Sequence, residues 1–287
     1  TELSKDDAAH LQQLIGEWGM LADLCFADMI LYLRDRDDEW LVGAQVRPAT
    51  GQTIYRTDLV DSVIDGPQAE LLGQVLSTAS IHEGEIVKDG IDGRIHVLAI
   101  PVRGESGPIA VLTREWSSRT SRQPGDLERT YLAIFDRFAA MIAEGSFPFS
   151  GRVADLSAAP RVGDGAIVLD ESATVRYASP NAVSALHRVG ISANAVGQSL
   201  SELGFADSPV RQAFERSEPV IEELEQTADV TLLVRCIPIL AEGVVTGAVM
   251  LLRDVTEVRR RDRMLLSKDA TIRRSEEHTS ELQSRQY

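Results

Sequence analysis

Residues 166–182 read AIVLDESATVRYASPNA, two short apolar runs joined by a polar turn and followed directly by Ser-Pro. Ala166 to Asp170 and Thr174 to Tyr177 predict the two strands of a hairpin, because each run is short and bounded by turn residues. Ser179 predicts a helix start, since its hydroxyl can accept a free backbone amide and proline at the first helical position loses no hydrogen bond. Three more strands are expected at 219–224, 229–239 and 243–253. Two strands, helices and three strands predict one α+β domain.

A second α+β unit is expected between the start of the chain and residue 147. Residues 11–25 and 126–144 carry apolar side chains at three- and four-residue spacing, which predicts amphipathic helices, and Pro67 opens another helix. Strands are expected at 27–33, 40–46, 95–102 and 109–113. Residues 148–160 lack periodicity and are rich in small residues, which predicts a linker between the two units.

The composition limits the classes of partner. The 287 residues are 44% hydrophobic and 25% charged, with a formal net charge of −15. Such an acidic surface repels phosphate backbones, so no direct nucleic-acid partner is expected. No apolar run reaches the roughly 18 residues that cross a bilayer, and no signal peptide is present, so we expect a cytoplasmic protein without a membrane partner. Cys25 and Cys236 lie far apart in the sequence, which argues against a disulfide framework or a metal site.

The last residues do not read like the rest of the chain. Residues 274–284, RSEEHTSELQS, match the in-frame translation of a common sequencing-adapter oligonucleotide. We therefore expect residues 274–287 to be an adapter-derived tail, with the natural sequence cut after about residue 273, and we leave this tail out of the fold prediction. A genuine polar helical tail is the alternative. The start at Thr1 is likewise expected to be clipped.

The end of the second unit carries two further signals. Residues 252–257, LRDVTE, place short polar side chains where a strand should stop and a helix begin, and such side chains can satisfy free backbone groups there. Val258, Leu265 and Ile272 then repeat every seven residues, which is the spacing of a coiled-coil seam. Residues 257–273 are therefore expected to begin a coiled-coil signalling helix, and a solvated terminal helix is the alternative.

These segments carry a resemblance to known families. The first unit, residues 1–147, resembles GAF domains in its order of elements, and residues 161–256 resemble a PAS domain. The LRDVTE segment is similar to the Asp-x-Thr junction that joins PAS domains to output helices. Residues 17–28 (EWGMLADLCFAD), 177–182 (YASPNA) and 253–273 together resemble the PdtaS family of actinobacterial cytoplasmic sensor histidine kinases.

The resemblance implies a function for the whole chain. In that family a GAF-like and a PAS domain precede a phosphoacceptor helix and an ATP-binding domain. The chain is thus expected to be the sensor region of a two-component histidine kinase. The intact protein would use ATP and magnesium to phosphorylate its own histidine, and would then pass the phosphoryl group to a response regulator with an RNA-binding antitermination domain. A homodimer is implied, and Asp254 and Thr256 are the expected signal-coupling residues.

The sequence itself lacks the catalytic parts of such a kinase. None of the five histidines lies in a His-x-x-x-Asn box, and no glycine-rich phosphate loop is present, so we expect no catalytic residue, cofactor or activity in this chain alone. Tyr177, Asn181 and His187 could wall a PAS pocket for an unknown sensory ligand, and the alternative role for these three residues is ordinary core packing or surface exposure. Two alternatives stay open: a stand-alone GAF–PAS module that binds a small ligand, and a sensor for a different output enzyme.

Overall fold

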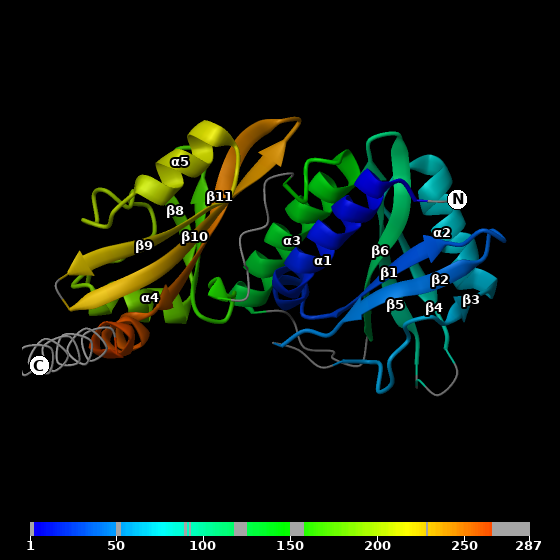
Figure 1. Ribbon diagram of the computed structural model, residues 1–287, viewed down its shortest axis with the longest axis horizontal. Coiled ribbons are helices and arrows are strands. Elements are labelled where there is room, and N and C mark those ends of the chain that lie inside the picture. The colour runs from blue at the N-terminus through cyan, green and yellow to red at the C-terminus, as the bar shows by residue number, and fades with distance from the viewer. Residues whose placement is uncertain are drawn as a thin grey trace, which may run out of the picture.

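The computed structural model describes residues 3–49, 53–88, 91, 93–117, 125–149, 158–227 and 229–265 (Figure 1). Within these residues the chain folds into two antiparallel sheets, each with its own helices. The first domain contains, in chain order, α1 (Lys5–Cys25), β1 (Asp28–Arg34), β2 (Trp40–Val46), β3 (Val63–Ile64), α2 (Gly66–Thr78), β4 (His82–Ile86), β5 (Ile95–Gly104), β6 (Gly107–Ser117) and α3 (Asp126–Glu144).

Both faces of the first sheet are covered. Its strand order is β3-β2-β1-β6-β5-β4, and α2 lies on the face opposite α1 and α3. Strand β1 shows why, since Met29 and Leu31 belong to the core under α1 and α3, whereas Ile30 and Tyr32 belong to the core under α2. Alternate residues of a strand point to opposite faces, so a strand that is apolar on both faces must be covered twice.

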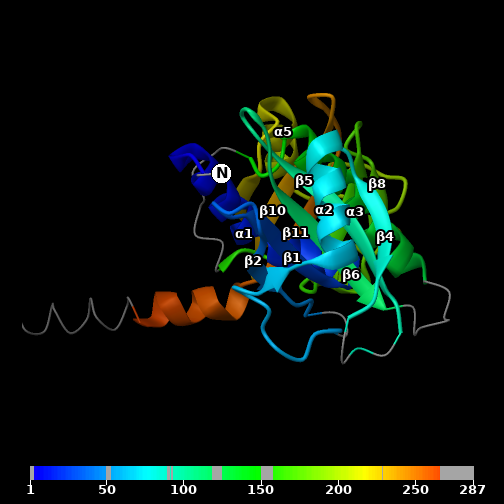
Figure 2. The same cartoon turned by 90° about the vertical axis from the view of Figure 1, so that its right-hand side faces the viewer.

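The second domain follows the order that the sequence predicts. Its elements are β7 (Ala166–Asp170), β8 (Val175–Ala178), α4 (Pro180–Arg188), α5 (Ser208–Arg216), β9 (Val220–Thr227), β10 (Val230–Ala241) and β11 (Val244–Asp254). The strands pair in the order β8-β7-β11-β10-β9, with α4 and α5 over the inner face of the sheet. A further helical segment, residues 256–265, leaves the end of β11 and projects away from the two sheets; it is called the exit helix below (Figure 1 and Figure 2).

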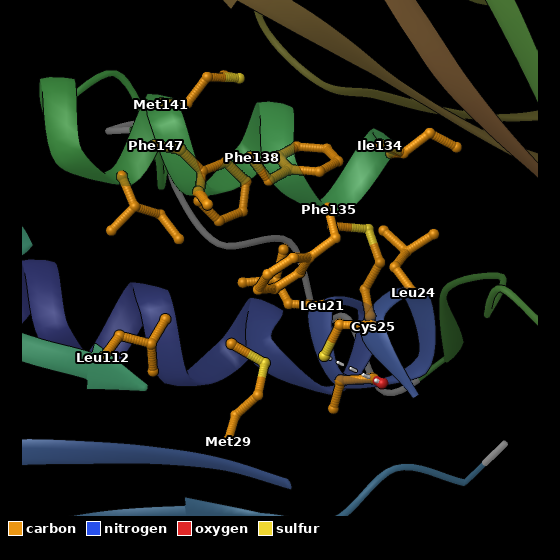
Figure 3. Close-up of a cluster of buried hydrophobic side chains, with 14 of the residues drawn as sticks. Leu21, Leu24, Cys25, Met29, Leu112, Ile134, Phe135, Phe138, Met141 and Phe147 are labelled. Carbon is orange, nitrogen blue, oxygen red and sulfur yellow. Dashed lines mark hydrogen bonds between the residues drawn. The ribbon is translucent and has the colours of Figure 1, made fainter. Parts of the chain in front are cut away.

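The outer face of the second sheet packs against α1 and α3 of the first domain. Ile237 and Ile239 of β10 and Val249 and Leu251 of β11 share one apolar core with these two helices. Figure 3 shows part of this core, in which Phe135 of α3 extends toward Leu21 and Cys25 of α1 and Phe138 packs against Phe147. Met141 lies on the side of α3 toward the second domain, and its sulfur accepts the backbone amide of Leu240 at 3.4 Å. The two domains are therefore joined through a shared core.

One glycine is required by this arrangement. Gly247 has a φ of 150°, and a Cβ built on it would lie 2.4 Å from the backbone oxygen of Leu169. Because β11 pairs with β7 at this position, only a residue without a side chain lets the two backbones approach.

Most predicted elements are confirmed, with informative exceptions. The helix at 126–144, the strand at 40–46 and the hairpin from residue 166 occur where they are predicted. Strand β4 and helix α5 were not predicted, and both have hydrophilic sequences, HEGEI and SPVRQAFER. Residues 274–287 and Ile272 lie outside the described residues. In the part of the chain that the structure describes, every helix is too short or too polar to cross a bilayer.

Candidate functional site at the start of the exit helix

Asp254 ends β11 and ties it to helix α4. One carboxylate oxygen accepts the Arg188 guanidinium at 2.6 Å, and the other accepts the backbone amide of Thr256 at 3.0 Å. Burial opposes ionisation of Asp254, but the hydrogen bonds from Thr256 and the charge of Arg188 outweigh it, so the pKa of Asp254 lies below its ordinary value. An ionised Asp254 therefore binds the last turn of α4 to the first turn of the exit helix.

Thr256 ties the same junction to the start of β10. Its hydroxyl oxygen accepts the backbone amide of Thr231 at 3.0 Å, and the backbone oxygen of Thr231 accepts the amide of Val255 at 3.0 Å. These bonds continue the pairing of β10 with β11 by one step past the last strand residue. Asp254 and Thr256 thus hold the junction to two different elements, α4 and β10.

Arginines of the exit helix meet acidic residues of the edge strand β9. Arg259 donates to Glu223, with Nε 3.0 Å from the carboxylate, and Arg263 lies 2.7 Å from Glu225. Residues four apart share one face of a helix, so both arginines turn the same face toward β9. Water and salt screen exposed pairs of this kind, so they orient the helix more than they stabilise it.

The apolar positions of the predicted seam face solvent. Val258 is 55% exposed and Leu265 is 62% exposed, while Ile272 lies outside the described residues. Large apolar side chains that remain exposed on a helix are available to a partner.

The three residues expected to wall a PAS pocket do not meet inside the second domain. Tyr177 packs edge-on against Tyr131 of α3, with ring centroids 6.2 Å apart, so it faces the first domain. Asn181 is exposed and donates to the backbone oxygen of Gly163 at 2.7 Å, and His187 is exposed on α4. The interior between α4, α5 and the sheet is lined by apolar side chains instead.

A buried polar cluster in the first domain was missed by the sequence reasoning. The Glu115 carboxylate is fully buried in β6 and accepts hydrogen bonds from Tyr32 at 2.8 Å, from Thr113 at 2.8 Å, from Gln68 at 3.2 Å and from Tyr55. Burial and the negative charge of Glu115 raise the pKa of both tyrosines, so each stays a neutral donor.

This cluster, called the Glu115 cluster below, fastens the β2–β3 connection to the sheet. Tyr55 lies in that connection, and Asp28 of β1 holds the same segment by accepting Thr53 at 2.7 Å and the amide of Ile54 at 2.6 Å. The hydrogen bonds of Tyr55, Thr53 and Ile54 thus hold the β2–β3 connection against β1 and β6. Among the described residues no group of three or more His, Cys, Asp or Glu side chains could hold a metal ion. The sequence carried only a weak signal for the Glu115 cluster, because Glu115 follows Thr113 and Arg114 in the polar second half of β6.

Family models match both domains. Residues 1–134 match the model described as the GAF domain of the histidine kinase PdtaS, and residues 160–260 match a PAS fold. The sensor histidine kinase PdtaS of Mycobacterium tuberculosis is 38% identical over 284 residues, and that of Mycolicibacterium smegmatis is 36% identical over 283 residues. Each alignment covers 92% of this chain and 56% of the relative, so the chain spans about half the length of these relatives.

A solved structure agrees with both domains at once. The sensor region of a sensor histidine kinase superposes with a TM-score of 0.77 at 33% identity, over 90% of this chain and 96% of that structure. Both the order of the two domains and their packing against each other lie within that match. The chain therefore belongs to the family of GAF–PAS sensor regions found in sensor histidine kinases of the PdtaS type.

Proposed function

We propose that this sensor region controls a histidine kinase core by setting the position of the exit helix. The observation that carries the proposal is the junction itself, where Asp254 binds α4 and Thr256 binds β10 within three residues of the chain. A change in either element would move the first turn of the helix, because the carboxylate and the hydroxyl leave it little freedom. Conformational states of a sensor can be selected in this way by small local contacts.

The intact protein would carry out the kinase reaction elsewhere in its length. The matched relatives extend well beyond the part that aligns with this chain, and their names state a sensor histidine kinase. There, ATP and magnesium would serve phosphorylation of a histidine, followed by transfer to a response regulator. An RNA-binding antitermination domain on that regulator is the output implied by the family resemblance. This chain alone would then be inactive in phosphoryl transfer.

Pairing of two copies would run through the exit helix. Val258 and Leu265 are seven residues apart and exposed, as positions of a coiled-coil seam must be before pairing. Helix α3 is covered by the second sheet, and the exposed positions of α1 are polar or small, so neither helix offers an apolar seam for this role. The proposal is therefore a homodimer joined at the exit helix.

The test uses a chimeric protein in which residues 1–273 are joined to the remaining part of the M. tuberculosis relative. Its autophosphorylation is measured with labelled ATP. Replacing both junction residues, D254A/T256A, should shift the rate toward that of the kinase part without a sensor region. The control D254N/T256S keeps hydrogen-bonding groups at both positions and should stay closer to the unaltered protein. An unchanged rate in D254A/T256A, with both domains folded by circular dichroism, would refute the proposed role of the junction.

The chain without any kinase part gives a second test. Incubated with ATP and magnesium it should incorporate no phosphate, and incorporation would refute the proposal that catalysis lies outside this chain. A sedimentation measurement of the same sample reports pairing, and V258D should reduce any dimer that forms.

A further inference from the structure

Strand β10 carries contacts to both the first domain and the exit helix. Arg235, in the middle of the strand, pairs with Glu17 of α1, and Thr231, at its start, holds Val255 and Thr256. We propose that Arg235 is a positioning residue through which the first domain sets the exit helix, by way of β10. This inference deepens the proposed function and rests on it. Two contacts hold the junction, one to Thr231 and one to Arg188, and they are called the Thr231 anchor and the Arg188 anchor below. The inference assigns a separate input to each anchor.

The pair between Glu17 and Arg235 is an ion pair that joins the two domains, beside the hydrogen bond that Arg137 of α3 donates to Thr246 of β11. The two side chains approach to 2.5 Å and are 13% and 5% exposed. A second polar atom on each side, Oε2 of Glu17 and Nε of Arg235, is buried without a hydrogen-bond partner among the described residues. Each charge therefore depends on the other, and a buried charge that loses its partner is strongly unfavourable. A movement of α1 must accordingly be followed by Arg235 or must break the pair.

The strand transmits such a movement because it is held on both sides. Thr231 and Arg235 are four residues apart on one face of β10, which is about 13 Å along a strand. The same strand is hydrogen-bonded to β9 on one side and to β11 on the other. A shift of Arg235 along the strand direction therefore moves the backbone of Thr231, and with it the amide of Val255 and the hydroxyl of Thr256.

The second anchor has a different origin. Arg188, which binds Asp254, lies at the end of α4, within the second domain, and α4 covers the inner apolar face of that sheet. The first domain packs on the outer face. The Thr231 anchor thus responds to the first domain, and the Arg188 anchor responds to the interior of the second domain.

Amide hydrogen exchange separates the two anchors, because each protects its own amide. The Val255 amide is bonded to Thr231, whereas the Thr256 amide is bonded to Asp254. In the complete chain, E17Q should speed exchange at Val255 about tenfold, and R188Q should do the same at Thr256 while leaving Val255 within about twofold. R94Q, which breaks an exposed ion pair inside the first domain, is the matched control and should change neither amide.

Conservative variants keep the test decisive. R235K retains the positive charge and should preserve more protection at Val255 than R235Q. If R235Q does not fold, the exchange rate of the Val255 amide in E17Q is sufficient to test the inference, because glutamine has the shape of the glutamate it replaces. Unchanged Val255 exchange in E17Q, with native protection of Met250 in β11, would overturn the inference. These measurements need no kinase activity, so a failure of the proposed kinase regulation leaves their result standing and can be told apart from it.

Discussion

Raising the pH from 8 to 10 should destabilise this protein through two buried thiols. Cys25 lies in the core shared by the two domains, where its thiol approaches the backbone oxygen of Ala22 at 3.6 Å (Figure 3). Cys236 lies in the core between the second sheet and α4 and α5. Both side chains are fully buried, and burial raises the pKa of each from 9.0 to about 12.

The direction follows from which state releases the proton. Between pH 9 and 12 the unfolded chain ionises its thiols while the folded chain keeps them protonated, so the folded state binds more protons and loses stability as the pH rises. Below pH 9 the contribution of the thiols is fully present. At pH 10, with pKa values of 9.0 and about 12, each thiol costs about 1–2 kcal/mol of unfolding free energy relative to pH 8. The two together cost about 3 kcal/mol.

Urea unfolding at pH 8 and pH 10, under reducing conditions, measures this loss. Tyrosines and lysines also titrate near pH 10, so the quantity of interest is the difference between the unaltered protein and the variants C25A and C236A. Each variant carries a constant cavity cost at both pH values, and each should lose about 1–2 kcal/mol less stability than the unaltered protein on going to pH 10. A loss equal to that of the unaltered protein, within about 0.4 kcal/mol, would refute the reasoning for that thiol.

Three further changes test other parts of the molecule by urea unfolding at pH 7. F138A removes a fully buried ring from the shared core and should cost about 3–5 kcal/mol. Y55F removes one hydroxyl donor from the buried Glu115 carboxylate and should cost about 1.5–3 kcal/mol. In amide hydrogen exchange, protection should be lost first in the β2–β3 connection, and a uniform loss across the first domain would contradict the fastening role. G247A places a Cβ against the backbone oxygen of Leu169 and should cost at least about 1–3 kcal/mol, whereas a neutral effect would show that β11 can shift there.

Local patterns predicted the elements whose sequences match their burial. Helix α3 was predicted over residues 126–144 because its apolar side chains are periodic, and β2 because its apolar run is bounded by turns. Strand β4 could not be predicted, since its sequence, HEGEI, suits a sheet edge and has few apolar residues. Helix α5 places only Pro209, Val210 and Ala213 in the core, too few for a clear period.

The junction at Asp254 and Thr256 shows a different limit of prediction from sequence. Asp254 and Thr256 were predicted from the resemblance of residues 252–257 to the Asp-x-Thr junction of PAS domains, but their partners Arg188 and Thr231 were not. A residue's long-range partner depends on strand pairing and packing, which spacing along the chain does not encode. The Glu115 cluster was missed for the same reason, since its donors come from four separate segments that only the folded sheet brings together.

Helix α3 packs in the core of the first domain and also contacts the second domain, and its sequence suits both contacts. Its buried side chains spread over more than one side of the helix, and a wide apolar arc is typical of a helix covered on several sides. Phe135 and Phe138 face α1 and the first sheet, whereas Tyr131 and Met141 contact Tyr177 and Leu240 of the second domain. A rotation of α3 that suits one sheet therefore disturbs the other. Because of this, α3 couples the packing of the two domains at their shared core, whereas the contact between Arg188 and Asp254 lies inside the second domain and reaches the exit helix separately.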